Sequence, residues 1–233
     1  GGVGKTVIAT NVALALHEFG KKVVAIDGDT TASNLALQLD MVPTSYTLYD
    51  VVEGKCDILD AVQVHSTGLM VLPSGFSIRR RELSVDVLYK VVKRLRGLAI
   101  IDSPPGFNKD VCSIIQVADE LIIVTNPEIP AVADAIKLVE LIRKLGKEKS
   151  VLGVVINKWR GRRYEINQSE VEIALELPVI AKIPYDEAVP KSIFAKIPVV
   201  RYKPYSKAAI ELRRLAAWLV DLEYSPPWFA PLL

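Results

Sequence analysis

The sequence of 233 residues has few of the side chains that usually hold metal centres. It contains only two cysteines, Cys56 and Cys112, which lie far apart with no C-x-x-C spacing. Its two histidines, His17 and His65, flank neither cysteine. Zinc and iron–sulfur sites require paired or clustered ligands, so neither kind of site is expected. We expect two reduced, buried thiols instead.

Long apolar runs and a strong net charge are also missing. Half of the residues are hydrophobic, yet apolar runs such as VVAI, LIIV and VLGVVI are short. A membrane-spanning helix needs about 20 consecutive apolar residues, so none is expected. The formal net charge is only +2, so the overall charge gives no strong attraction to DNA or acidic lipid. We expect a cytoplasmic location.

Short β-branched runs alternate with segments of helical periodicity along the chain. Nearly continuous Val, Ile and Leu is typical of strands covered on both faces, which predicts a parallel sheet. The alternation predicts an α/β fold with a doubly wound, mostly parallel sheet flanked by helices. We expect one domain over residues 1–223 and a proline-rich tail over 224–233. The expected strands are 22–27, 69–73, 98–102, 120–125, 151–157 and 179–184, and the expected helices are 6–19, 47–61, 82–95, 130–145, 169–177 and 206–222.

The first six residues, GGVGKT, have the composition of a phosphate-binding loop. Small residues allow backbone N–H groups to approach phosphate oxygens, and the positive end of the helix that follows favours anions. Lys5 is placed to reach the β- and γ-phosphates, and the Thr6 hydroxyl to bind Mg²⁺. The alternative is a glycine-rich turn before an ordinary helix.

Three carboxylates follow two of the expected strands. Asp27 and Asp29 come at the end of strand 22–27, and Asp102 ends strand 98–102, just before the turn that contains Gly106. Ligands of open α/β sheets bind at the carboxyl ends of the strands. Each acid alone could be a helix cap or a turn residue. Together, behind a phosphate loop, they predict a site for a nucleotide and its metal ion.

Several stretches resemble the deviant Walker A ATPases of the MinD/ParA family. These are GGVGKT, DGDTTASNL and DSPPG. The stretches TLYDVVEGKCDILDAV, LPSGFS, VTNPEIPAVADAIK, VVINK and IPYDEAVPKSIFAKIPVVRYKPYS resemble the MinD type specifically, so the resemblance extends to about Leu222. It implies a P-loop ATPase that uses ATP/ADP and Mg²⁺, dimerises on binding ATP, and acts with a protein partner in spatial positioning such as division-site placement. Contact with the inner face of the cell membrane is a secondary expectation.

The resemblance also implies a role for each matching residue. Lys5, Asp29 and Asp102 are the expected catalytic residues, and Asp29 orients the attacking water. The expected metal site comprises Thr6, Asp27 and Asp102. Asn157, which alone is more often a turn residue, is expected to contact adenine. The expected nucleotide contacts are Gly1, Gly2, Val3, Gly4, Lys5, Thr6, Val7, Asn157, Pro184 and Asp186.

Three features differ from the family pattern. Val7 stands where a second hydroxyl usually contacts the α-phosphate, which implies modestly weaker nucleotide binding. The family has a lysine immediately before the position of Gly1 that reaches across a two-fold dimer, and the printed sequence begins after it. The final residues YSPPWFAPLL are neither basic nor helical, unlike the membrane-binding helix of many MinD proteins. Trp228 and Phe229 either pack onto the domain or form a small anchor.

A loop of the G-x-x-x-x-G-K-[ST] kind follows a strand, and its first glycine would lie upstream of Gly1. The resemblance places that strand beside residues 98–102. Its loss would leave backbone groups unpaired, at roughly 1 to 3 kcal/mol each. We therefore expect the sequence to be a fragment that lacks about ten residues, comprising one strand and the start of the loop.

Three other functions stay open from the sequence. The chain could be a nucleotide-binding adaptor without significant hydrolysis, a DNA-segregating ATPase of the ParA type, or an iron–sulfur carrier of the NifH and Mrp type. Cys112 alone is a poor match to the last of these. The basic clusters 79–81 and 159–164 could meet nucleic-acid or lipid phosphates. We expect them to be solvated loops, and DNA is not an expected partner.

Overall fold

The structure is a computed structural model of the chain, and it describes residues 2–29, 33–42, 46–75 and 82–228. Some residues singled out in the sequence lie outside these ranges. They are Gly1, Arg79, Arg80, Arg81 and Phe229.

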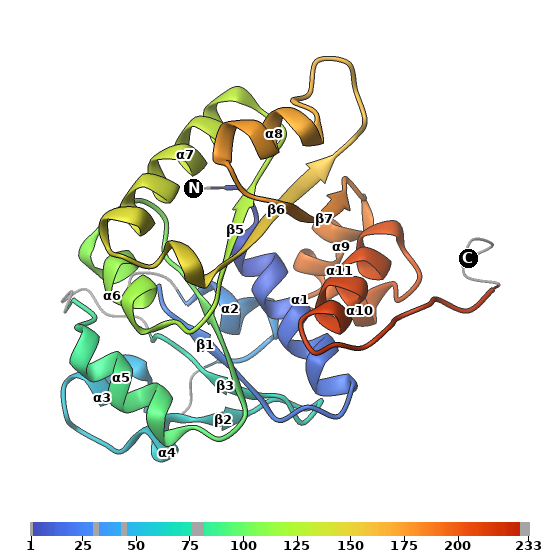
Figure 1. Ribbon diagram of the computed structural model, residues 1–233. Coiled ribbons are helices and arrows are strands. Elements are labelled where there is room, and N and C mark those ends of the chain that lie inside the picture. The colour runs from blue at the N-terminus through green and yellow to red at the C-terminus, as the bar shows by residue number, and fades with distance from the viewer. Residues whose placement is uncertain (1, 30–32, 43–45, 76–81, 229–233) are drawn as a thin grey trace.

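The described strands form two sheets, one of four strands and one of three (Figure 1). One sheet has the order β2-β3-β1-β4 and the other the order β5-β6-β7. Every neighbouring pair is parallel except β2 with β3, which is antiparallel. The strands are β1 Val23–Asp27, β2 Gln63–Val64, β3 Met70–Leu72, β4 Leu98–Asp102, β5 Leu121–Thr125, β6 Val151–Trp159 and β7 Val179–Pro184.

A cleft of about 760 Å³ follows the facing edges of β4 and β5. In the described part of the chain, β4 pairs only with β1 and β5 only with β6. Leu98 in β4 is consequently 39% exposed, although the apolar run predicted a strand covered on both faces. The additional strand expected beside residues 98–102 stays a prediction, and the open edge of β4 is where it would pair.

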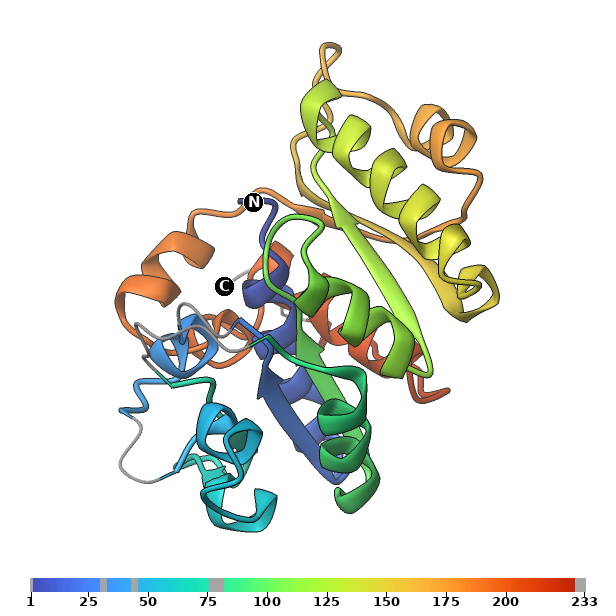
Figure 2. The same cartoon turned by 90° about the vertical axis from the view of Figure 1, so that its left-hand side faces the viewer.

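Helices cover both faces of the strands, as a doubly wound fold requires (Figure 2). On one face, α1 packs against α11, and their shared apolar core includes residues of β1, β6 and β7, so it joins the two sheets. On the other face, α5 and α6 pack together below β1, and α7 and α8 cover β5 and β6. The helices are α1 Lys5–Glu18, α2 Asn34–Gln38, α3 Leu48–Val52, α4 Ile58–Ala61, α5 Val85–Arg94, α6 Lys109–Val117, α7 Ile129–Lys144, α8 Gln168–Leu175, α9 Ala188–Phe194, α10 Val199–Tyr202 and α11 Lys207–Trp218, with a short 3₁₀ helix η1 at Glu148–Ser150.

Strand β1 shows why the apolar runs are continuous. All five of its residues are buried. Val23 and Ala25 face the core that α1 and α11 share, and Val24 and Ile26 face the core beneath α3, α4, α5 and α6. Alternate side chains of a strand point to opposite faces, so a strand between two helical layers needs apolar residues at every position.

The predicted helix over 47–61 is wrong, because the structure has two short helices there. Gly54 adopts a left-handed conformation with φ 72°, which ends α3 at a position where a side chain would be strained. Asp57 then begins α4 by accepting a hydrogen bond from the N–H of Leu59 at 3.1 Å. Helices α2, α6, α9 and α10 were also missed, as was the two-residue strand β2, and all but α6 are short.

Two further expectations concern cysteine and membrane spans. Cys56 and Cys112 are free thiols, but both are only partly buried, so the prediction of fully buried thiols is wrong. No helix in the described ranges combines the length and apolar character needed to cross a membrane.

Beyond α11, the ring centre of Tyr224 lies 6.0 Å from that of Phe19, whereas Trp228 is 87% exposed.

Packing of α1 into the core that joins the two sheets can be tested with Leu14→Ala. Leu14 has no exposed surface. We expect the variant to lose about 2 to 5 kcal/mol of unfolding free energy, because the removed atoms leave a cavity. Urea denaturation measures this change. Ile173→Ala is the control, since Ile173 on α8 is 77% exposed and its truncation should cost less than about 0.5 kcal/mol. Equal losses in the two variants would contradict the placement of α1.

Candidate functional site

The loop at the start of α1 exposes the positive end of a helix of 14 residues. Gly2 and Gly4 have φ values of 85° and 97°, which glycine adopts without a steric penalty. Gly4 immediately precedes the helix, and the first turn of α1 contains no acidic residue that would occupy its N–H groups. The loop therefore has the backbone conformation and the electrostatics of an anion site.

Two consecutive residues of β6 hold this loop by its carbonyl groups. The Asn157 side-chain amide donates to the carbonyl oxygen of Val3 at 2.8 Å, and the Lys158 ammonium donates to that of Gly2 at 2.8 Å. A Cβ at Gly4 would lie only 2.3 Å from Nδ2 of Asn157, so the close approach requires glycine at that position. The sequence predicted Asn157 as an adenine contact, and the structure places it against the phosphate loop.

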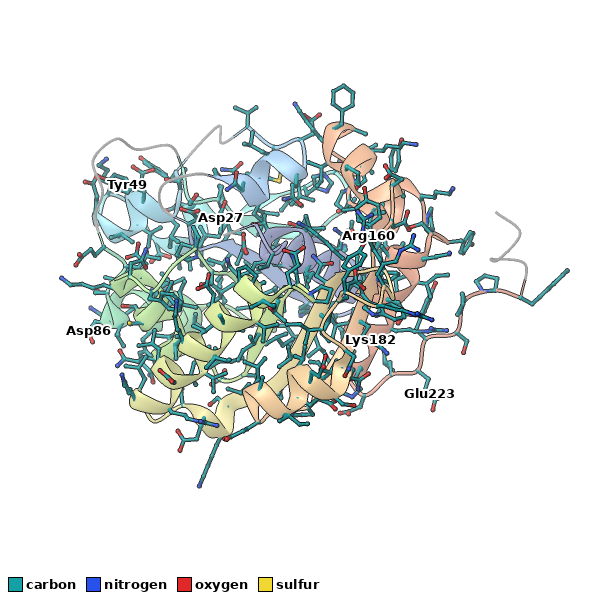
Figure 3. All side chains as sticks on the ribbon, turned by 90° about the horizontal axis from the view of Figure 1, so that it is seen from above. Asp27, Tyr49, Asp86, Arg160, Lys182 and Glu223 are labelled. Carbon is teal, nitrogen blue, oxygen red and sulfur yellow. The ribbon has the colours of Figure 1, made fainter. Side chains whose placement is uncertain are left out.

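The carboxylates of Asp27 and Asp102 lie at the ends of adjacent strands. These residues are opposite each other in the β1–β4 register, and their exposed fractions are 0% and 2%. Gly28 makes the approach possible, because a Cβ there would lie 2.6 Å from the carbonyl oxygen of Asp102. The N–H of Gly28 donates to that oxygen at 2.9 Å. Figure 3 shows Asp27 within the fold, whereas Asp86 lies at its edge.

Burial makes both carboxylates reluctant to ionise. It raises the pKa of Asp27 to about 7, and the charge of Asp102 adds to this effect. Burial likewise raises the pKa of Asp102 to about 6, although the Thr6 hydroxyl and the Lys5 ammonium oppose the rise. A bound cation between these groups would favour their charged forms.

The residues present fit a magnesium ion that is shared with phosphate groups. Oδ1 of Asp102 is buried and has no hydrogen-bond partner among the described residues, and the Thr6 hydroxyl lies next to this carboxylate. Among residues that the structure describes, no three His, Cys, Asp or Glu side chains are grouped to hold a metal by themselves. Mg²⁺ commonly takes one or two carboxylates, with phosphate oxygens and waters as its other ligands. Thr6, Asp27 and Asp102 would supply the protein part of such a shell.

Asp29 lies beside this group and is 7% exposed. Its backbone N–H donates to Oδ1 of Asp27 at 3.1 Å, and the N–H of Leu35 donates to Oδ2 at 3.2 Å. The turn after β1 and the start of α2 are thus fixed to the Asp27 carboxylate. The structure brings together Lys5, Thr6, Asp27, Asp29 and Asp102, as the sequence predicted, while Gly1 lies outside the described residues.

The remaining predicted residues lie along β7 and in the first turn of α1. Pro184 of β7 is opposite Trp159 of β6, and Trp159 lies two positions after Asn157 in the same strand. Asp186 accepts hydrogen bonds from the N–H groups of Ala188 at 2.8 Å and Ala208 at 3.1 Å. Burial acts to raise the Asp186 pKa, but these donors, with the Ser206 hydroxyl and the Lys203 charge, bring the pKa below its usual value. Asp186 therefore holds the starts of α9 and α11 together.

Val7 belongs to the first turn of α1, where its carbonyl oxygen accepts a hydrogen bond from the side chain of Asn11 at 2.8 Å. Asn11 also accepts from the N–H of Val200 at 3.0 Å, so it links α1 to α10. Val7, which stands where the family pattern has a second hydroxyl, therefore lies on a helical turn that these two hydrogen bonds hold in place.

Sequence reasoning missed two polar residues at the strand ends. Asn126 follows β5, is 7% exposed, and has a buried Oδ1 without a partner beside the cleft that Gly2 and Lys5 also line. Lys158 follows Asn157 and binds the loop carbonyl of Gly2. A polar residue directly after an apolar strand is the signal that could have identified Asn126, whereas Lys158 lies within β6 and no local pattern marks its contact with Gly2.

A family model matches most of the chain. The model describes the CobQ/CobB/MinD/ParA nucleotide binding domain, and it matches residues 1–199.

Curated proteins and solved structures give consistent matches. An uncharacterized ATP-binding protein of Methanocaldococcus jannaschii is 37% identical over 228 residues, covering 96% of this chain and 86% of the relative. The structure resembles the cell division ATPase MinD of Pyrococcus furiosus with a TM-score of 0.86 and 33% identity, covering 96% of this chain and 95% of that one. It also resembles the septum site-determining protein MinD of Pyrococcus horikoshii, complexed with Mg-ADP, with a TM-score of 0.83 and 30% identity, covering 94% and 91%.

The raised pKa values of Asp27 and Asp102 predict a stability that falls as pH rises. An acid with a folded pKa above its unfolded value binds more protons in the folded state, so ionisation opposes folding. Without metal or nucleotide, we expect the unfolding free energy to fall by about 1 kcal/mol or more between about pH 5 and pH 8. Urea denaturation across this range measures the effect.

Asp102→Asn should flatten this dependence, because it removes one buried acid and the charge that faces Asp27. Asp86→Asn is the control, since Asp86 is exposed on α5 and its loss should leave the dependence unchanged. A dependence in Asp102→Asn as steep as that of the unmodified protein would contradict the paired burial of the two acids.

Proposed function

The chain belongs to the family of CobQ/CobB/MinD/ParA nucleotide-binding domains, and we propose that it is an ATP-hydrolysing, MinD-type switch. In this proposal the protein binds MgATP, dimerises, engages a protein partner and returns to its resting state after hydrolysis. The Mg-ADP complex of the Pyrococcus horikoshii relative supports the choice of ligand. The Pyrococcus furiosus relative, a cell division ATPase, supports a role in spatial positioning.

One observation carries the proposal. Lys5 and Thr6 at the start of α1 lie against Asp102, which is opposite Asp27 at the ends of two buried strands. The positive helix end, an ammonium and a hydroxyl thus meet two acids that ionise reluctantly without a cation. A triphosphate with its magnesium supplies both the anion that the first set attracts and the cation that the second requires.

In this proposal different residues bind the phosphates, the magnesium ion and the base. The N–H groups of the loop and the first turn of α1 hold phosphate oxygens, and Lys5 balances the charge of the β- and γ-phosphates. Bound Mg²⁺ would neutralise charge that develops on the transferred phosphoryl group. Thr6 and Asp102 orient that site from the protein side, while Asp27 anchors the turn that carries Asp29. In this proposal Pro184 walls the base side of the nucleotide, Asn157 holds the phosphate loop through the Val3 carbonyl, and Asp186 fixes the starts of α9 and α11.

Hydrolysis requires a water in line with the bond between the γ-phosphorus and the bridging oxygen. In this proposal Asp29 orients this water at the γ-phosphate. As the water oxygen attacks phosphorus, the bond to ADP breaks, and the water's proton is released with inorganic phosphate. Slow turnover suits a switch, because the lifetime of the dimer then follows the lifetime of ATP.

The proposal predicts separate effects for two substitutions. Lys5→Ala should weaken MgATP binding at least tenfold, because the phosphates lose their ammonium partner. Asp29→Ala should keep MgATP binding within about threefold and lower phosphate release by about 10² or more, because the attacking water loses its orienting group. Calorimetry measures binding, and inorganic phosphate release measures turnover.

Asp86→Ala serves as the matched control, since Asp86 is an exposed acid on α5. Folding of each variant is checked by urea denaturation. MgATP binding without phosphate release in the unmodified protein would favour the nucleotide-binding adaptor, and binding of neither MgATP nor MgADP would exclude both functions.

A further inference from the structure

Lys158 binds the phosphate loop although nothing in the family resemblance assigned it a role. Its ammonium donates to the Gly2 carbonyl, and the amide of the preceding residue, Asn157, donates to the Val3 carbonyl. Two adjacent residues of β6 thus hold two adjacent carbonyls from the other end of the sequence. The loop leads into α1, so this pair connects the three-stranded sheet to the helix that packs on β1 and β4.

A regular strand could not present these two side chains to the same loop. Consecutive residues of a strand point to opposite faces. In β6, however, Lys158 adopts a left-handed conformation with φ 58°. The register with β7 also shifts here. Ile156 is opposite Lys182, and Trp159 is opposite Pro184, so β6 advances by three residues while β7 advances by two. One extra residue in β6 is a β-bulge, a feature that redirects side chains near functional sites.

Holding the carbonyls also fixes the N–H groups of the loop. A trans peptide is planar, and its C=O and N–H groups point in opposite directions. When the Gly2 carbonyl points to Lys158, the N–H of Val3 points away from β6. When the Val3 carbonyl points to Asn157, the N–H of Gly4 does the same. The two bonds therefore align two successive N–H groups for an anion on the far side of the loop.

We propose that Lys158 is a positioning residue for phosphate binding, acting through the Gly2 carbonyl to orient the amide of Val3. The proposal rests on the nucleotide-binding function proposed above. Asn157 performs the same task at the next peptide, and the bulge in β6 allows both side chains to reach the loop. The strained backbone of Lys158 is thereby explained, because it brings the ammonium to the loop.

The difference in burial between the two residues decides which one to substitute. Asn157 is 8% exposed and lies against Gly4, so its removal would leave a cavity there and would disturb the fold. Lys158 is exposed, so its side chain can be changed while the core stays intact. Lys158→Met keeps the length of the side chain and a similar backbone cost, and removes the donor. Lys191→Met is the control, because it removes an exposed lysine of α9 and the same charge.

Hydrogen–deuterium exchange of the protein without nucleotide tests the anchor directly. We expect the amide of Ile8, which donates to the Gly4 carbonyl at 3.1 Å, and the amides of residues 9–11 in the next turn to exchange about tenfold faster in Lys158→Met, and at an unchanged rate in Lys191→Met, because the loop that begins α1 loses a charge-assisted hydrogen bond. Lys158→Arg, which retains a donor, should restore most of the protection. Since no phosphate is present, a direct contact between Lys158 and the ligand could not produce this change.

Calorimetry then tests the consequence for binding. In Lys158→Met, the dissociation constant for MgADP should rise about tenfold, while that for adenosine, which has no phosphate, should change less than about twofold. Unchanged exchange at residues 8–11, or equal losses for MgADP and adenosine, would overturn the positioning role. If the unmodified protein bound no MgADP, the proposed function would fail, and the exchange result would still decide whether Lys158 anchors the loop.

Discussion

The buried pair of acids at the ends of β1 and β4 is the constraint on which the site depends. Asp27 and Asp102 are opposite each other in a parallel register, burial raises the pKa of both carboxyl groups, and the charge of Asp102 raises that of Asp27 further. A fold that keeps both of these acids ionised at neutral pH needs a compensating positive charge. The Lys5 ammonium and the open positive end of α1 supply part of it, and a magnesium ion with its phosphates would supply the rest.

The same constraint explains the local sequence around the pair. Gly28 has to be small, because a side chain there would meet the backbone of β4. Gly4 has to be small, because Asn157 approaches it from β6. These contacts come from opposite sides, one from each sheet. Both positions therefore tolerate little side-chain volume, whereas the charges are supplied by residues that begin helices or end strands.

Much of this arrangement could be predicted from the sequence, for reasons that are local. Four consecutive apolar residues, as in β1, indicate a strand between two helical layers, and an acid directly after such a run lies at the sheet edge where ligands bind. The division of residues 47–61 into two helices could not be predicted as securely, because the apolar period continues across Gly54. The contact of Lys158 with Gly2 joins residues 156 positions apart and depends on a one-residue shift in pairing, which no local pattern specifies.

The position of Asn157 shows how the two ends of a nucleotide can be linked in this fold. Its amide donates to the phosphate loop, while the strand that carries it continues to Trp159, opposite Pro184 on the expected base side. A shift of β6 relative to α1 would therefore break the contact between Asn157 and the loop. Because the shared core of α1 and α11 also includes residues of β6 and β7, the two sheets cannot rotate apart without exposing apolar surface. The bond from Asn157 and the shared core of α1 and α11 consequently join the expected phosphate loop to β6 and β7.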